Sequence, residues 1–126
     1  MEKISALIDG LSRDGKWQEA NAEAIRKRPR AGKALRAALL RHRDPNVREG
    51  CAELLGEFDD IAAVPELISA LRDSSEHVRF DALLALEKIL KVDLRWWLNV
   101  EAYRDSPRKV HDRVSGWWRR NRHYVS

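Results

Sequence analysis

Apolar residues recur along the chain at spacings of three and four positions, the period of an amphipathic α-helix. Clean strand-type alternation is missing, and polar residues break the pattern at the intervals expected of helical hairpins. One break, Asp44-Pro45, is a strong helix start, because aspartate caps free amides and proline needs no donor in the first turn. Ser106-Pro107 repeats that arrangement. The pattern predicts eight helices, near residues 2–13, 16–28, 31–42, 45–58, 61–72, 75–91, 94–103 and 107–122.

The pattern also repeats internally, with an offset of 31 residues and no gap. Leu40, Val47 and Arg48 correspond in this register to Leu71, Val78 and Arg79. The apolar face of the following helix matches as well, in the pairs Cys51/Ala82, Leu54/Ala85, Leu55/Leu86 and Phe58/Ile89. Each unit is therefore a short helix, a polar turn and a longer helix. Such a hairpin cannot bury its apolar stripe alone, so the units must stack.

These stretches, Ala63–Asp73 followed by Val78–Leu86 and, in the earlier copy, Arg43–Arg48 followed by Leu55-Gly56, resemble the HEAT repeat in its short bacterial form. The resemblance implies an all-α fold, a right-handed α–α superhelix of about four helical hairpins. It also implies a ladder of hydrogen bonds between repeats, formed by the turn aspartate and the arginine after the valine. Asp73, Arg79 and Arg48 occupy those positions, whereas His42 stands where the first copy should have its aspartate.

The length fits one domain, residues 1–126. We expect an N-terminal hairpin over 2–28, the two clearest repeats over 31–60 and 61–91, and a Trp-rich, basic C-terminal cap over 92–126. With 35% charged residues, no apolar run long enough for a membrane span and no signal-type N-terminus, the sequence predicts a soluble, cytoplasmic protein. The single cysteine, Cys51, excludes an intramolecular disulfide and reads as a small buried apolar residue.

The two longer repeat helices differ on the side away from the core. The first carries an acidic row, Glu49, Glu53 and Glu57, whereas the second carries Phe80 and Leu84 among apolar residues nearly all round. A helix of that kind needs cover on several sides. We expect the C-terminal segment to fold back over Phe80 and Leu84; alternatively, these two side chains are an exposed anchor for a partner.

The C-terminal segment combines aromatic and basic residues, eight Lys/Arg against three Asp/Glu over residues 94–126. Val110, Val114, Trp117 and Trp118 form one apolar stripe on the last helix, and with Trp96 and Trp97 they are expected to seal the end of the stack. A basic stripe, Lys109, Arg113, Arg120 and His123, with Gly116 completing the spacing, follows the opposite face. It is either a solvated surface, a surface for an acidic protein or a nucleic-acid surface.

No catalytic motif is present: the sequence has no phosphate-binding glycine loop, no nucleophile elbow and no zinc or calcium signature. The four histidines are scattered in polar surroundings. We therefore expect a protein without catalytic residues, metal or cofactor. We expect it to bind a protein partner, with the acidic row and, if they are exposed, Phe80 and Leu84 as the candidate contacts. The alternative is nucleic-acid binding through the basic stripe; no membrane partner is expected, and the oligomeric state is left open.

Overall fold

The computed structural model describes residues 3–12, 15–93 and 106–124. These residues form helices and turns without a strand, so the predicted all-α helical-repeat fold is confirmed. The helices are α1 (Ile4–Asp9), α2 (Gly15–Arg26), α3 (Ala31–Arg41), α4 (Pro45–Glu57), α5 (Val64–Ala70), α6 (Glu76–Leu90) and α8 (Pro107–Asn121). Short 3₁₀ turns, η1 (Gly10–Ser12), η2 (Ile61–Ala63) and η3 (Arg122–Tyr124), extend α1, precede α5 and follow α8. The helix predicted over 94–103, with Trp96 and Trp97, lies outside the described residues.

The helix boundaries follow from local chemistry. Asp44 caps α4 as expected, because its Oδ1 accepts a hydrogen bond from the Asn46 amide at 2.9 Å and Pro45 takes the first position. Ser75 does the same for α6 through the Val78 amide. Ser106 differs from the prediction: it precedes Pro107 but makes no capping hydrogen bond with its side chain.

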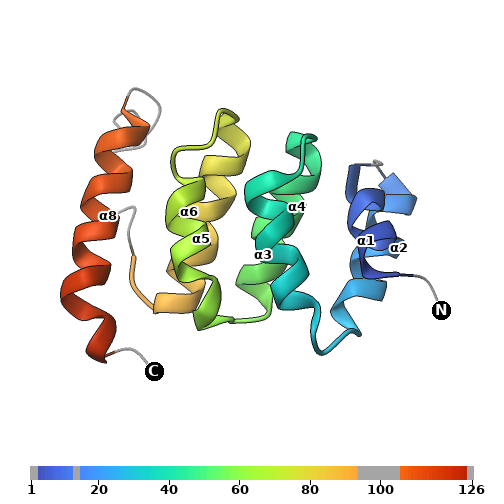
Figure 1. The fold of residues 1–126 in the computed structure, drawn as a ribbon, viewed down its shortest axis with the longest axis horizontal. Helices are drawn as coiled ribbons and strands as arrows, with labels where there is room; N and C mark the ends of the chain where they lie inside the picture. The colour runs from blue at the N-terminus through green and yellow to red at the C-terminus, as the bar shows by residue number, and fades with distance from the viewer. Residues whose placement is uncertain (1–2, 13–14, 94–105, 125–126) are drawn as a thin grey trace.

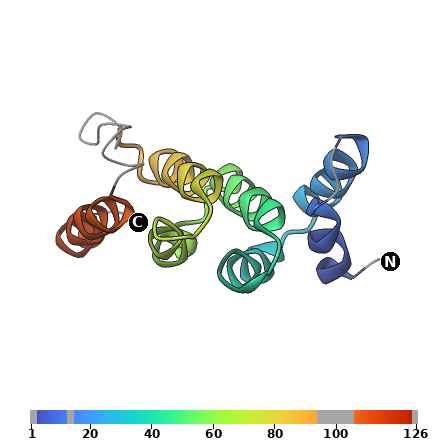
Figure 2. The same ribbon diagram turned by 90° about the horizontal axis from the view of Figure 1, so that it is seen from above.

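The helices form two layers (Figure 1, Figure 2). Seen from above, α3, α5 and α8 lie side by side in one layer, and α4 and α6 lie side by side in the other. The helix α8 packs against α5. Its first turns lie near the α5–α6 turn, since Arg72 contributes to the electrostatic surroundings of Asp112. The last helix therefore extends the layer of the short first helices.

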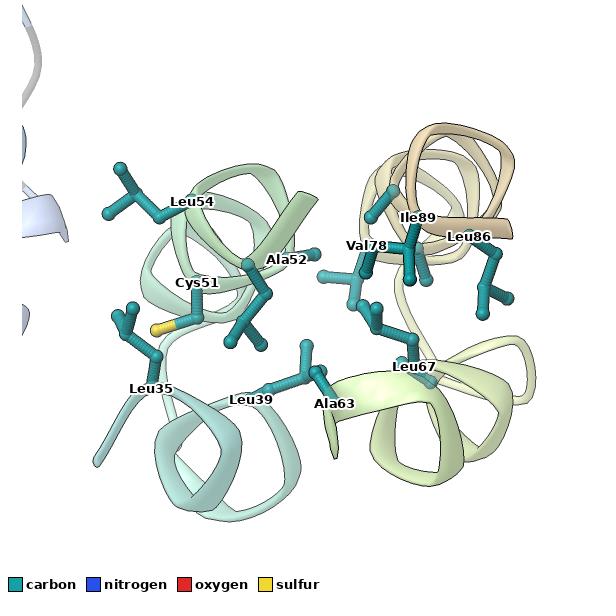
Figure 3. Packing of buried hydrophobic residues seen from close by; sticks show 14 of the residues in the cluster. Leu35, Leu39, Cys51, Ala52, Leu54, Ala63, Leu67, Val78, Leu86 and Ile89 are labelled. Atoms are coloured by element: carbon teal, nitrogen blue, oxygen red, sulfur yellow. The ribbon is translucent and has the colours of Figure 1, made fainter. Parts of the chain in front are cut away.

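The core lies between the two layers. Leu35 and Leu39 of α3 and Leu67 of α5 point toward side chains of α4 and α6 (Figure 3). The corresponding residues Cys51 and Ala82 are both fully buried, which agrees with the repeat register. Small residues let the long helices approach closely: a Cβ added to Gly56 would lie 3.0 Å from the Cα of Ala85. The repeats thus share one continuous apolar interior.

The two copies of the repeat do not bury the same residue at every corresponding position. Leu71 is fully buried, whereas the corresponding Leu40 is 48% exposed. The reason is local: α3 continues to Arg41, so Leu40 faces outward from a regular helix, but α5 ends at Ala70 and Leu71 already belongs to the turn. One repeat therefore buries a leucine that the other leaves in solvent.

Candidate interaction surfaces

The two repeats are joined by an ion pair between Arg48 and Asp73. The Arg48 Nε and one Nη donate to the two carboxylate oxygens of Asp73 at 2.9 and 3.0 Å. Both side chains are nearly buried, with exposed fractions of 12% and 11%. The other Nη of Arg48 donates to the His42 carbonyl at 2.7 Å, and Arg79 makes the equivalent bond to the Asp73 carbonyl at 2.7 Å. Each arginine therefore also fixes the turn of its own repeat.

His42 takes the place of the aspartate in the preceding repeat. Its Nδ1 accepts from the Asp44 amide at 3.1 Å, just as the Asp73 Oδ1 accepts from the Ser75 amide at 2.9 Å. A ring nitrogen that accepts leaves the proton on Nε2, and Nε2 lies 2.8 Å from the Asp9 carboxylate of the N-terminal hairpin. The direction of this rung is therefore reversed: the acid comes from the earlier unit and the hydrogen-bond donor from the later one.

The acidic row on α4 is divided between two roles. Glu57 accepts from the Arg26 Nε at 2.7 Å, and Arg26 also binds Glu19 at 2.8 Å and Glu23 at 3.3 Å. Hydrogen bonds to Glu57 and then Glu19 hold the pKa of Arg26 above its usual value. Glu57 thus links α4 to α2, and its charge is already compensated. Of the acidic row, Glu49 and Glu53 remain as candidates for contact with a partner.

Those two glutamates meet a third carboxylate, Asp81 of α6. Burial, followed by the charge of Glu49 and a hydrogen bond with it, raises the pKa of Asp81 to about 7. Glu53 adds to the rise and His77 opposes it. In the part of the chain that the structure describes, no lysine or arginine forms an ion pair with these three acids. They therefore form a negative cluster across the α4–α6 boundary.

Phe80 and Leu84 lie on α6 beside this cluster in sequence. Phe80 is 41% exposed and Leu84 is half-buried. Within the described residues, α8 packs against α5 in the other layer and does not cover Phe80; residues 94–105 of the expected cover lie outside the described residues. We use the name α4–α6 surface for Glu49, Glu53, Asp81, Phe80 and Leu84. The five residues combine negative charge with accessible apolar area.

The basic stripe lies on the solvent side of α8. Lys109, Arg113, Arg120 and His123 are exposed, whereas Val110 and Val114 are buried against the core. Trp117 and Trp118 are half-buried and pack against that core, as the apolar stripe predicts. Gly116 is buried and lies next to the Arg120 guanidinium, whose Nη1 would be 3.2 Å from an added Cβ. The basic stripe on α8 and the pair Phe80 and Leu84 on α6 thus lie in different layers.

The described residues offer little for catalysis. They contain no group of three or more His, Cys, Asp or Glu side chains placed to hold a metal ion. The pair His111–Asp112, 2.9 Å apart, lies exposed at the start of α8, where the imidazole lowers the pKa of Asp112. Burial raises the pKa of the Cys51 thiol to about 12, so it is a neutral core side chain. An open pocket of about 510 Å³ near the α2–α3 turn is lined by Arg26, Arg28, Pro29, Gly32, Phe58, Asp59, Asp60 and Ile61.

Three elements of these surfaces were not apparent from the sequence. Asp81 occupies a helical position between two apolar residues, and only the packing of α4 on α6 brings it to Glu49. Arg26 lies in the last turn of α2, and its link to Glu57 spans 31 positions. Asp9 reaches His42 across 33 positions. For the contacts of Arg26 and Asp9, a separation of about one repeat length was the signal in the sequence that could have indicated them.

Comparison with known proteins agrees with this architecture. The family model for HEAT repeats matches residues 32–95, which is half of the chain. The protein therefore belongs to the HEAT-repeat family, whose stacked hairpins commonly act as scaffolds for protein interaction. No curated protein matches the sequence. None of the helices in the described ranges is long and apolar enough to cross a membrane.

Proposed function

We propose that this protein is a non-catalytic binding module whose α4–α6 surface holds a protein partner. The partner presents a lysine or arginine to the Glu49–Asp81 pair and an apolar side chain to Phe80 and Leu84. The observation that carries the proposal is the contact between two carboxyl groups that form no ion pair with a lysine or arginine in the described chain. A cation placed there would relieve their repulsion, which makes this a favourable point for a basic group.

The apolar half of the surface supports the same partner. A partly exposed phenylalanine can supply the anchor that dominates many interfaces, provided that the partner excludes water around it. The adjacent acids then favour partners in which a basic residue flanks the apolar one. Glu57 lies outside the proposed contact because Arg26 already occupies it.

The repeat frame contributes by holding the surface in place before binding. Gly56 and Ala85 bring α4 and α6 into close contact, and the Arg48–Asp73 pair locks one repeat to the next. Residues on two such helices lose little conformational entropy when a partner binds. A rigid surface of this kind suits a scaffold or adaptor.

The test is affinity capture from a lysate of the source cells, treated with nuclease, followed by identification of the retained protein. Glu53→Lys reverses the charge of an exposed member of the surface and should abolish retention. Glu66→Lys makes the same charge change on α5, in the opposite layer, and should leave retention intact. Equal retention by Glu53→Lys and the unmodified protein would refute the proposed surface.

A further inference from the structure

The outer face of α8 and η3 is nearly uniform in charge. Its exposed cations are Arg108, Lys109, Arg113, Arg119, Arg120 and Arg122, together with His123, whereas Asp112 is an exposed acid held by His111. The helix α8 contacts α5, and the residues of α8 that reach the core belong to its apolar stripe, so the exposed cations lie on the side away from that contact. A row of cations on one helix is typical of a surface that binds a polyanion.

One exposed aromatic side chain stands within this basic face. Tyr124 is 84% exposed and directly follows Arg122 and His123 in η3. The tryptophans of α8 do not offer the same surface, because Trp117 and Trp118 pack against the core. An accessible aromatic ring among cations is the combination that binds single-stranded nucleic acid, in which a base stacks on the ring and the cations follow the phosphates.

The face carries little that could read a base sequence. The one amide side chain on α8, Asn121, donates to the carbonyl of Trp117 at 2.8 Å within its own helix. The remaining groups are point charges or guanidinium groups suited to phosphates. Duplex DNA hides the faces of its bases within the stack, so the tyrosine ring would find no base to stack on there.

We infer that α8 and η3 form a binding site for single-stranded nucleic acid, contacted through its phosphates by the arginines and through one base face by Tyr124. The site lies in the layer opposite α4, so it is independent of the α4–α6 surface. It recognises the phosphate chain and a base plane, which DNA and RNA share.

Fluorescence anisotropy with labelled twelve-residue oligomers of deoxythymidine and of uridine tests the site, at salt concentrations from 50 to 200 mM. The intact chain should bind both oligomers. With about three phosphates contacted, the log–log salt slope should be about −2, and a duplex of equal length should bind more weakly. Absence of salt-dependent binding to both oligomers would overturn the inference.

Variants separate specific contacts from general positive charge. Arg120→Ala with Arg122→Ala should reduce the salt slope by about 1.4, whereas Lys33→Ala with Arg41→Ala removes the same charge from α3 and should not change it. Tyr124→Ala should weaken binding by about tenfold, and Tyr124→Phe should retain it because the ring remains. These exposed positions carry no core packing. Equal losses in the two double variants, or unchanged binding by Tyr124→Ala, would contradict the site.

Discussion

Arg48 and Asp73 pair through two parallel hydrogen bonds of 2.9 and 3.0 Å across the boundary between the two repeats. The planar guanidinium matches the carboxylate, and both groups are removed from most of the solvent. Further bonds to backbone groups of both turns satisfy the pair. It therefore fixes the position of one repeat relative to the next, which an apolar contact would specify less sharply.

Removal of the Arg48 side chain should strongly destabilise the fold. Arg48→Ala leaves the Asp73 carboxylate nearly buried without its partner, and we expect the free energy of unfolding to fall by about 3–5 kcal/mol. Arg48→Lys retains the charge but not the two-point geometry, so it should lose less. Urea denaturation followed by circular dichroism measures both. A loss below about 1 kcal/mol for the alanine variant would show that the pair does not hold the repeats together.

The reversed rung can be restored to the usual polarity. His42→Asp alone places a second carboxylate beside Asp9, and we expect it to lower the free energy of unfolding by about 1 kcal/mol. Adding Asp9→Arg recreates an arginine–aspartate rung across the same boundary and should recover that loss. A double-mutant cycle in urea gives the coupling. Strict additivity of the two substitutions would contradict the proposed equivalence of His42 and Asp73.

The Glu49–Asp81 contact predicts an unusual pH dependence. Because the folded-state pKa of Asp81, about 7, lies above the ordinary aspartate pKa of 3.8, the folded state binds more protons between these values. The contribution of Asp81 to stability is therefore full below pH 4 and is lost as the pH rises toward 7. Asp81→Asn should flatten this decline and raise the free energy of unfolding at pH 8 by roughly 1–2 kcal/mol, after allowance for solvent screening of a half-buried group.

Urea denaturation at pH 5 and pH 8 measures this difference, since Glu49, Glu53 and His77 are present in both proteins. The control is Glu66→Gln on α5, which leaves the ion pairs of Arg26 and the negative cluster around Asp81 intact. Glu23→Gln would not serve, because Glu23 is one of the ion-pair partners of Arg26. If Asp81→Asn and the unmodified protein show parallel pH profiles, Asp81 is an ordinary ionised carboxylate.

Two glycines of α4 should respond oppositely to alanine. Gly56→Ala places a Cβ 3.0 Å from the backbone of Ala85, which cannot move without shifting α6, and should cost about 1–2 kcal/mol. Gly50→Ala meets the Cδ1 of Leu11, the end of a side chain and not backbone, at 3.2 Å. There the gain in helix propensity, up to about 1 kcal/mol, should prevail. Thermal unfolding compares the pair, and equal changes in Tm would refute the close approach.

Much of the fold was predictable because it depends on local periodicity. The apolar spacing located α3, α4 and α6 within a residue or two, and Asp44-Pro45 marked the start of α4. The 31-residue offset placed Val47 and Val78 correctly as buried equivalents. The same offset misassigned Leu40, since the two short helices end at different points in the repeat.

The surfaces were less predictable because they depend on which helices pack together. The row of three glutamates was visible on one helix, but its division required Arg26 from α2 and Asp81 from α6. The exposure of Phe80 depends on the layer that α8 joins, and residue spacing within α8 holds no information about that choice. Tyr124 carries no helical periodicity that would distinguish an exposed ring from a buried one.

The most direct measurement is photo-crosslinking in the source cells, with a photoreactive phenylalanine derivative placed at position 80. We predict a discrete protein adduct that disappears when Glu53→Lys is added and survives nuclease treatment. The same derivative at position 40, which is exposed on α3 in the other layer, should give no such adduct. Equal crosslinking from both positions, or none from position 80, would contradict a partner on the α4–α6 surface.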